Sequence, residues 1–114
     1  MITLHTYKAK LIKVIDGDTI DANIDLGFDV WVKKRIRLYG INAPETRTTD
    51  LEEKNKGLSS KERLVALMGQ EGALFTIKSH GVEKYGRCLG EIWVGEENIN
   101  ELLVLEGYAV PYML

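Results

Sequence analysis

The sequence is poor in cysteine and proline and has no long hydrophobic run, and each absence excludes a class of protein. The single cysteine, Cys88, rules out an internal disulfide and a multi-cysteine zinc site, and it favours a reducing, intracellular compartment. No apolar stretch is long enough for a membrane span or a secretory leader, so we expect a cytoplasmic or phage-encoded protein with no membrane partner. The 114 residues contain no linker-like or repetitive segment, so we expect one domain, residues 1–114, acting as a monomer.

A large excess of charge of one sign is also missing. The chain has 15 basic and 17 acidic side chains and a net charge of −2, which excludes a strongly basic protein that coats nucleic acid through bulk charge. The charges are nevertheless segregated, with five aspartates between Asp16 and Val30 and five basic residues but one acid between Lys33 and Arg47. An acidic block beside a basic block suits a cation bound next to a phosphate. The alternative is two solvated strand faces.

The remaining composition, 45% apolar and 28% charged, is that of an ordinary globular domain. Apolar and polar residues alternate in three successive segments, which predicts strands over residues 8–15, 19–26 and 28–39. Residues 16–18, Asp-Gly-Asp, are a hairpin turn signal between the first two strands. The third strand is expected to turn Phe28 and the alternate residues that follow it toward the core.

The second half of the chain predicts two helices and two more strands. Residues 40–55 show no period and are expected to form a long, mobile loop. The capping box at Ser59–Glu62 predicts the start of a helix, residues 73–79 and 87–94 predict strands, and Asn98 is expected to cap a second helix. The order βββ-α-ββ-α predicts a mainly β, α+β fold, namely a five-stranded Greek-key barrel of the OB type, whose faces and loops often bind oligonucleotides.

Two aspartates at the first turn are candidates for a metal site. Asp18 has the same parity as the apolar residues Ile20 and Ala22, so its carboxylate is expected to point inward at the open end of the sheet. A carboxylate in that position needs a partner or a metal, and hard cations such as Ca²⁺ prefer oxygen ligands. The alternative is that Asp16 and Asp18 only make the turn.

Two arginines are candidates for phosphate binding. Arg37 lies near the end of the third predicted strand, and Arg87 opens the fifth, directly after a glycine. Guanidinium groups grip phosphate oxygens bidentately, and two of them would stabilise the charge of a five-coordinate transition state. The alternative, that each is a surface arginine, is the more common case for arginines taken singly.

A glutamate and a tyrosine complete the set of candidates from residue chemistry. Pro44 stiffens the chain before Glu45, so that this carboxylate is held in place and can accept a proton from an attacking water. The alternative is an exposed loop glutamate. Tyr85, close to Arg87, can offer an aromatic surface to a base or a hydroxyl group to a phosphate.

Taken together, these motifs resemble the staphylococcal (micrococcal) nuclease family. The matching segments follow in the family's order across residues 8–112 and are Val14–Thr19, Arg37–Glu45, Lys84–Gly90, Asn100–Glu101 and Gly107–Ala109. The resemblance implies a five-stranded OB barrel with helices. It also implies a Ca²⁺-dependent phosphodiesterase, an endonuclease that cuts DNA and RNA with little sequence preference and leaves 3′-phosphates.

The resemblance also implies a role for individual residues. Arg37 and Arg87 match the two phosphate-clamping arginines, and Glu45 matches the glutamate usually drawn as the general base. Lys84 and Tyr85 match residues that touch the terminal phosphate of the nucleotide.

The metal site is where this sequence departs from the family. Asp18 matches a metal-ligand aspartate, and Asp16 matches the aspartate just outside the direct ligands. The second ligand carboxylate falls at Asn42, whose amide oxygen can still bind Ca²⁺ but carries no charge. The site therefore predicts weaker metal binding. The alternatives to a nuclease are a catalytically impaired, nucleic-acid-binding OB module, which Asn42 favours, and a protein-interaction barrel, which the mildly acidic charge favours.

Overall fold

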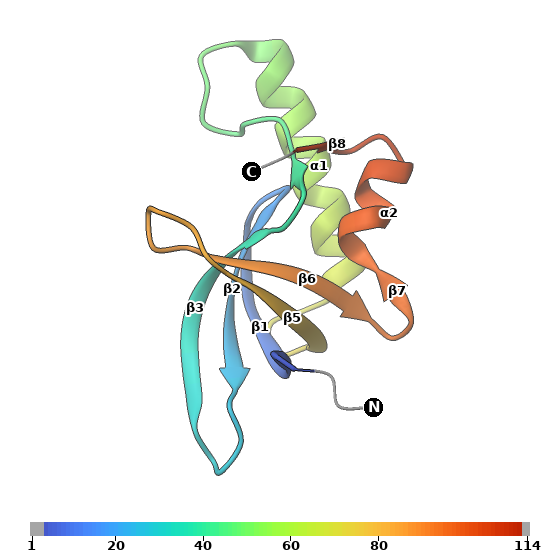
Figure 1. The fold of residues 1–114 in the computed structure, drawn as a ribbon. Coiled ribbons are helices and arrows are strands. Elements are labelled where there is room, and N and C mark those ends of the chain that lie inside the picture. The colour runs from blue at the N-terminus through green and yellow to red at the C-terminus, as the bar shows by residue number, and fades with distance from the viewer. Residues whose placement is uncertain (1–3, 113–114) are drawn as a thin grey trace.

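The computed structural model describes residues 4–112, and its main body is a closed barrel of five strands (Figure 1). The strands are β1 (Thr6–Asp16), β2 (Thr19–Asp25), β3 (Trp31–Leu38), β5 (Leu74–Val82) and β6 (Cys88–Val94). β1 pairs antiparallel with both β2 and β5, and β3 pairs with the other edge of β2. A short parallel pairing of β3 with β6 closes the sheet, which confirms the predicted OB-type barrel.

Two helices and three short strands make up the other elements of the described residues. Helix α1 (Leu51–Met68) lies between β4 (Ile41–Asn42) and β5, and helix α2 (Ile99–Leu105) follows β7 (Glu97–Asn98). The last strand, β8 (Val110–Pro111), pairs antiparallel with β4. None of the three short strands is predicted by the sequence, because two residues are too few to show a period. Within residues 4–112, no helix is both long and apolar enough to cross a membrane.

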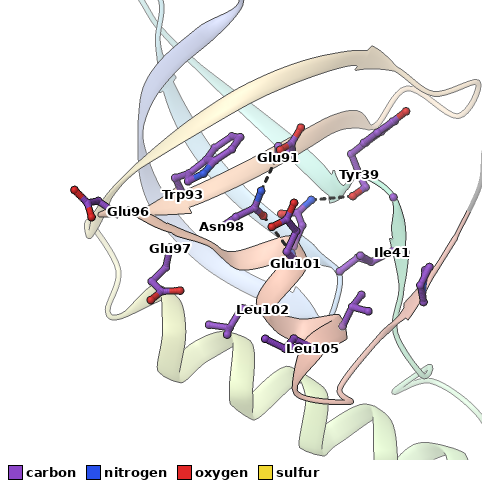
Figure 2. Close-up of a pocket in the computed structure, with 14 residues that line it drawn as sticks. Tyr39, Ile41, Glu91, Trp93, Glu96, Glu97, Asn98, Glu101, Leu102 and Leu105 are labelled. Carbon is purple, nitrogen blue, oxygen red and sulfur yellow. Dashed lines mark hydrogen bonds between the residues drawn. The ribbon is translucent and has the colours of Figure 1, made fainter.

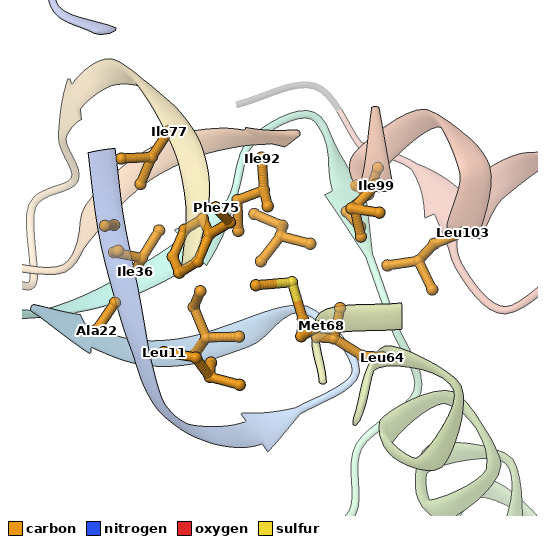
Figure 3. Packing of buried hydrophobic residues seen from close by; sticks show 14 of the residues in the cluster. Leu11, Ala22, Ile36, Leu64, Met68, Phe75, Ile77, Ile92, Ile99 and Leu103 are labelled. Atoms are coloured by element: carbon orange, nitrogen blue, oxygen red, sulfur yellow. The ribbon is translucent and has the colours of Figure 1, made fainter. Parts of the chain in front are cut away.

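The core fills the barrel and the space under the helices, as alternation in the strands predicts (Figure 3). Each of the five barrel strands and both helices contribute apolar side chains to it. The largest side chains that are fully buried are Ile20, Ile36, Leu38, Leu64, Ile92, Ile99 and Leu103.

Helix α1 begins earlier than predicted. The loop predicted through residue 55 ends at Asp50, whose side chain accepts hydrogen bonds from the first backbone N–H groups of the helix. Asp50 is therefore the N-cap, and Ser59 lies inside the helix, exposed. The prediction fails because the first two turns of α1 carry mainly charged and exposed side chains and hide the helical period. The second predicted cap is confirmed, since Asn98 accepts from the backbone N–H of Glu101.

Strand β3 is shorter than predicted. It begins at Trp31, and Phe28 is fully exposed instead of facing the core. Phe28 and Asp29 adopt positive φ angles of 54° and 62°, and Leu26 N–H donates to the carbonyl of Val30 at 2.8 Å. These residues form the turn of the β2–β3 hairpin, which extends past the rest of the barrel (Figure 1). The alternation continued through the turn by chance, so the sequence pattern could not show where the strand begins.

Candidate active site

A cavity of about 660 Å³ at one end of the barrel is lined by every residue predicted for the site. The cavity lies where β2 and β3 meet the segment after β4 and the β5–β6 turn. The structure thus brings together four segments that are far apart in the sequence. The predicted residues among its lining are Asp16, Asp18, Arg37, Asn42, Glu45, Lys84, Tyr85 and Arg87.

Asp18 is buried at the start of β2, as its parity predicts. One carboxylate oxygen accepts the backbone N–H of Ala43 at 2.9 Å, and the other accepts the hydroxyl of Thr19 at 3.0 Å. Its backbone carbonyl accepts from Leu38 N–H at 2.8 Å. Asp18 therefore ties β2 to β3 and to the segment after β4 while its carboxylate faces the cavity. Asp18 therefore belongs to the turn between β1 and β2 and also contributes its carboxylate to the lining of the cavity.

Arg37 is the buried cation of the cavity, with only 8% of its surface exposed. Its Nη2 donates to Asn42 Oδ1 at 3.1 Å and lies 3.9 Å from Asp18 Oδ2. Among the described residues, its Nη1 is buried without any hydrogen-bond partner. The ring of Tyr112 lies 5.1 Å from the guanidinium carbon. Arg37 is thus not a surface arginine, and one of its donors has no hydrogen-bond partner among the described residues.

Arg87 is held by a residue that sequence reasoning missed. Glu83 Oε1 accepts the backbone N–H of Arg87 at 2.9 Å and its Nε at 3.3 Å. Burial raises the pKa of Glu83, but the hydrogen bonds from Arg87 outweigh it and hold the pKa below its usual range. The spacing of four residues across a turn containing Gly86 was the available signal. Tyr112, which the sequence analysis did not assign to the site, likewise lines the cavity.

The remaining candidates lie at the mouth of the cavity. Glu45 is exposed, and Asp16 accepts a hydrogen bond from the hydroxyl of Thr46. Lys84 and Tyr85 occupy the β5–β6 turn, where the ammonium group lies 5.1 Å from the tyrosine ring. The exposed side chains of Glu45, Lys84 and Tyr85 are accessible from the solvent side of the cavity.

Small residues on α1 let two segments that line the cavity approach the helix closely. A Cβ at Gly57 would lie 2.4 Å from the carbonyl oxygen of Glu45, and one at Gly17 would lie 2.7 Å from the Cβ of Ser60. Contacts this short exclude any larger side chain without movement. Ser60 also donates to the carbonyl of Tyr108 at 2.6 Å. The helix therefore positions Glu45 and the Asp16–Asp18 turn through backbone contact.

The oxygen donors of the cavity suit a hard divalent cation in kind, but they are few. Asp18 offers a buried carboxylate, Asn42 an amide oxygen and Glu45 a second carboxylate at the mouth. Within residues 4–112, no group of three or more His, Cys, Asp or Glu side chains is placed to hold a metal ion. A cation here would retain several waters as ligands. Ca²⁺ accepts water oxygens alongside carboxylate and amide oxygens.

A larger cavity of about 1010 Å³ lies between β6, β7 and α2 (Figure 2). Trp93, Leu102 and Leu105 line it, and four glutamates surround them. Glu91 is engaged by His80 at 2.6 Å and by Asn98 at 3.1 Å. This concentration of negative charge repels a polyanion, so the smaller cavity with Arg37 is the candidate site for a phosphate.

Comparisons with known proteins show the family of the chain. Residues 35–114 match the family model described as "Staphylococcal nuclease homologue". The chain is 30% identical over 105 residues to a thermonuclease of Staphylococcus hyicus, covering 92% of this chain and 58% of the relative. It is 30% identical over 114 residues to protein ParB of Escherichia coli, with 92% and 57% covered.

A thermonuclease of Staphylococcus intermedius is 32% identical over 97 residues, which cover 85% of this chain and 55% of that protein. The chain thus spans little more than half the length of these curated relatives. The family match covers most of the chain and includes Arg37, Asn42, Glu45 and Arg87. The chain belongs to the family of staphylococcal nuclease homologues.

Proposed function

We propose that this domain is a nuclease, a Ca²⁺-dependent phosphodiesterase that cuts DNA, RNA or both with little sequence preference and leaves 3′-phosphates. The observation that carries the proposal is Arg37, a buried guanidinium with an unpartnered Nη1 in a cavity shared with Asp18 and Glu45. A buried cation with a free donor is costly unless an anion completes it. Relatives described as thermonucleases support a nucleic acid phosphate as that anion.

The residues of the cavity divide the work of phosphodiester cleavage. Arg37 and Arg87 donate to the non-bridging oxygens of the scissile phosphate and stabilise the charge of its five-coordinate transition state. Glu45, exposed at the mouth, accepts the proton of the attacking water. Lys84 and Tyr85 contact the terminal phosphate, and the Glu83 hydrogen bonds fix the direction of Arg87.

Ca²⁺ would be held by Asp18 and Asn42, and when bound it supplies charge that polarises the phosphate. Asp16 lies just outside these ligands and accepts from Thr46. Its place next to the Asp18 turn suits a residue that orients waters around the ion.

Cleavage assays on a single-stranded DNA and an RNA of mixed sequence test the proposal. We expect cleavage with Ca²⁺ and none with EDTA, with 3′-phosphate ends on the products. Arg37→Ala and Arg87→Ala should each lower kcat by about 10²–10³-fold, as for other preorganised charge donors. Arg63→Ala is the matched control, because Arg63 pairs with Glu106 at 2.7 Å outside the cavity lining. Wild-type rates in both cavity variants would refute the two-arginine mechanism.

A second candidate function is a nucleic-acid-binding module that no longer cleaves. The observation that favours it is the neutral Asn42, whose amide oxygen is already engaged by Arg37 at 3.1 Å. In that case the protein would bind a labelled strand with a strong salt dependence, and it would release no product at any Ca²⁺ concentration.

A further inference from the structure

The chain has a net charge of −2, but basic side chains outnumber acidic ones on the outward face of β1, β2 and β3. The outward residues of β1, β2 and β3 form a series of rows that run across the three strands, and the last row of the series lines the cavity. The row at the cavity is Asp16–Thr19–Arg37, and the two rows farthest from it are Lys10–Asn23–Lys33 and Lys8–Asp25–Trp31. We call Lys8, Lys10, Trp31 and Lys33 the basic strand face; all four are exposed.

Two of the acids within these rows, Asp21 and Asp25, already accept hydrogen bonds. Asp21, in the row between, is bound by Arg35 at 2.8 and 3.1 Å. Asp25 accepts the backbone N–H of Gly27 at 2.8 Å. The lysines of the face, in contrast, form no ion pair with an acid among the described residues. A backbone N–H does not cancel the charge of Asp25, so the face carries three lysines against one carboxylate and has an excess of positive charge.

The aromatic and basic groups of the face lie together. Lys10 Nζ is 4.8 Å from the ring centroid of Trp31, although one strand separates them. Trp31 is 41% exposed, so part of its ring remains open to solvent. A π surface among ammonium groups is the arrangement that binds single-stranded nucleic acid, through stacking on bases and contact with phosphates.

The face and the cavity lie on one path. β3 carries Trp31, Lys33 and Arg37 on the same side, and six residues at about 3.3 Å each separate the first from the last by roughly 20 Å. OB folds bind about 4–16 nucleotides, so a strand in the cavity can extend over this distance.

We propose that the basic strand face is a second binding site, which holds the part of a single-stranded polynucleotide that extends beyond the cleaved phosphate. This inference rests on the proposed function for the identity of the ligand. It assigns Lys10 and Lys33 to phosphate contacts and Trp31 to base stacking. Arg35 contributes little, because Asp21 already occupies its guanidinium.

Salt-dependent binding of fluorescein-labelled oligothymidylate, measured by anisotropy in EDTA, tests the inference without cleavage. A probe of about 20 nucleotides spans both sites, and one of about 4 fits the cavity alone. Lys10→Ala/Lys33→Ala should reduce the slope of log Kd against log salt by about 1.4 for the long probe, because each phosphate contact contributes about 0.7. Trp31→Ala should weaken the long probe about tenfold and leave the slope unchanged.

Lys54→Ala/Lys61→Ala removes the same charge from α1 and is the matched control. We expect its slope for the long probe, and the affinity of all variants for the short probe, to equal wild type. A slope in Lys10→Ala/Lys33→Ala equal to the control overturns the inference, even if the protein cleaves with Ca²⁺. If the slope is reduced in Lys10→Ala/Lys33→Ala but the wild-type protein never cleaves with Ca²⁺, the second binding site is supported and only the nuclease proposal is refuted.

Discussion

At the scale of single residues, the site is defined by how one buried cation is neutralised. Arg37 faces an amide, Asn42, at 3.1 Å and a carboxylate, Asp18, at 3.9 Å. The Asp18 carboxylate balances the charge of the guanidinium, but Nη1 of Arg37 is left without a hydrogen-bond partner among the described residues. In the proposed site a metal ion would have a single buried carboxylate ligand, so we expect added negative charge at residue 42 to favour metal binding and to disfavour phosphate binding.

The substitution Asn42→Asp measures this balance. It adds one charge without changing side-chain length, and charge on oxygen ligands strengthens Ca²⁺ binding, so we expect about tenfold tighter binding by calorimetric titration. Cleavage at limiting Ca²⁺ should rise in parallel. Asn23→Asp adds the same charge on the outer side of β2 and should leave Ca²⁺ affinity unchanged. Equal affinities in wild type and Asn42→Asp would show that residue 42 does not face the ion.

At the scale of elements, α1 determines where the loop that carries Glu45 lies. Its buried residues follow one stripe, in which Gly57 and Ser60 contact the loops and Leu64 and Met68 pack on the core. A glycine in the interior of a helix normally costs about 1 kcal/mol relative to alanine. Here the close approach of the Glu45 carbonyl requires it. Local helix stability is given up so that a loop can pack against the helix.

Gly57→Ala separates these two effects. The new methyl group would meet the Glu45 carbonyl oxygen at 2.4 Å and that of Pro44 at 2.9 Å, so the loop has to move. We expect kcat to fall at least tenfold, since a displacement of about 1 Å in a catalytic group has effects of this size or greater. The higher helix propensity of alanine should limit the loss in the free energy of unfolding to about 1–3 kcal/mol.

Ser59→Ala changes an exposed neighbour on α1 and serves as the control. Both its kcat and its melting temperature should match wild type, because Asp50 caps the helix. A large loss of stability in Ser59→Ala would mean that α1 begins where the capping box predicts.

At the scale of the whole molecule, charge is distributed by face. Basic groups occupy the outer side of β1 and β3, and glutamates surround the cavity by α2 (Figure 2). Arg35 pairs with Asp21 across β2 and β3, and Arg63 of α1 pairs with Glu106, which follows α2. The hydrogen bond from Arg35 holds the pKa of Asp21 below its usual range, against the opposing effect of burial.

Stability should therefore depend on Asp21 in acid. A carboxyl group whose pKa is lower in the folded than in the unfolded state stabilises the fold above its unfolded pKa, and this contribution disappears as the pH falls through the folded pKa. We expect Arg35→Gln to unfold at lower urea concentration than wild type at pH 7, with the difference shrinking toward pH 3. Lys34→Gln, which removes an adjacent charge, should shift both curves far less. A difference that stays constant with pH would contradict the role of the ion pair.

The sequence by itself determined the five barrel strands and the existence of both helices, although not where β3 and α1 begin, and it named eight of the residues that line the candidate site. Alternation fixed the inward parity of Asp18 and Ile20, since a strand repeats every two residues. Short motifs named the site residues through their family resemblance. These signals are local, so they are visible without a structure.

Only the tertiary structure decided how these pieces meet. The parallel closure of β3 on β6, the β4–β8 pairing and the approach of Gly57 to Glu45 join residues far apart in the chain. Burial of Arg37 and its bond to Asn42 follow from that closure, because a side chain at a strand end is exposed until another segment covers it. Long-range packing has no local period, and therefore the pattern of residues could name the site but could not show that its cation is buried.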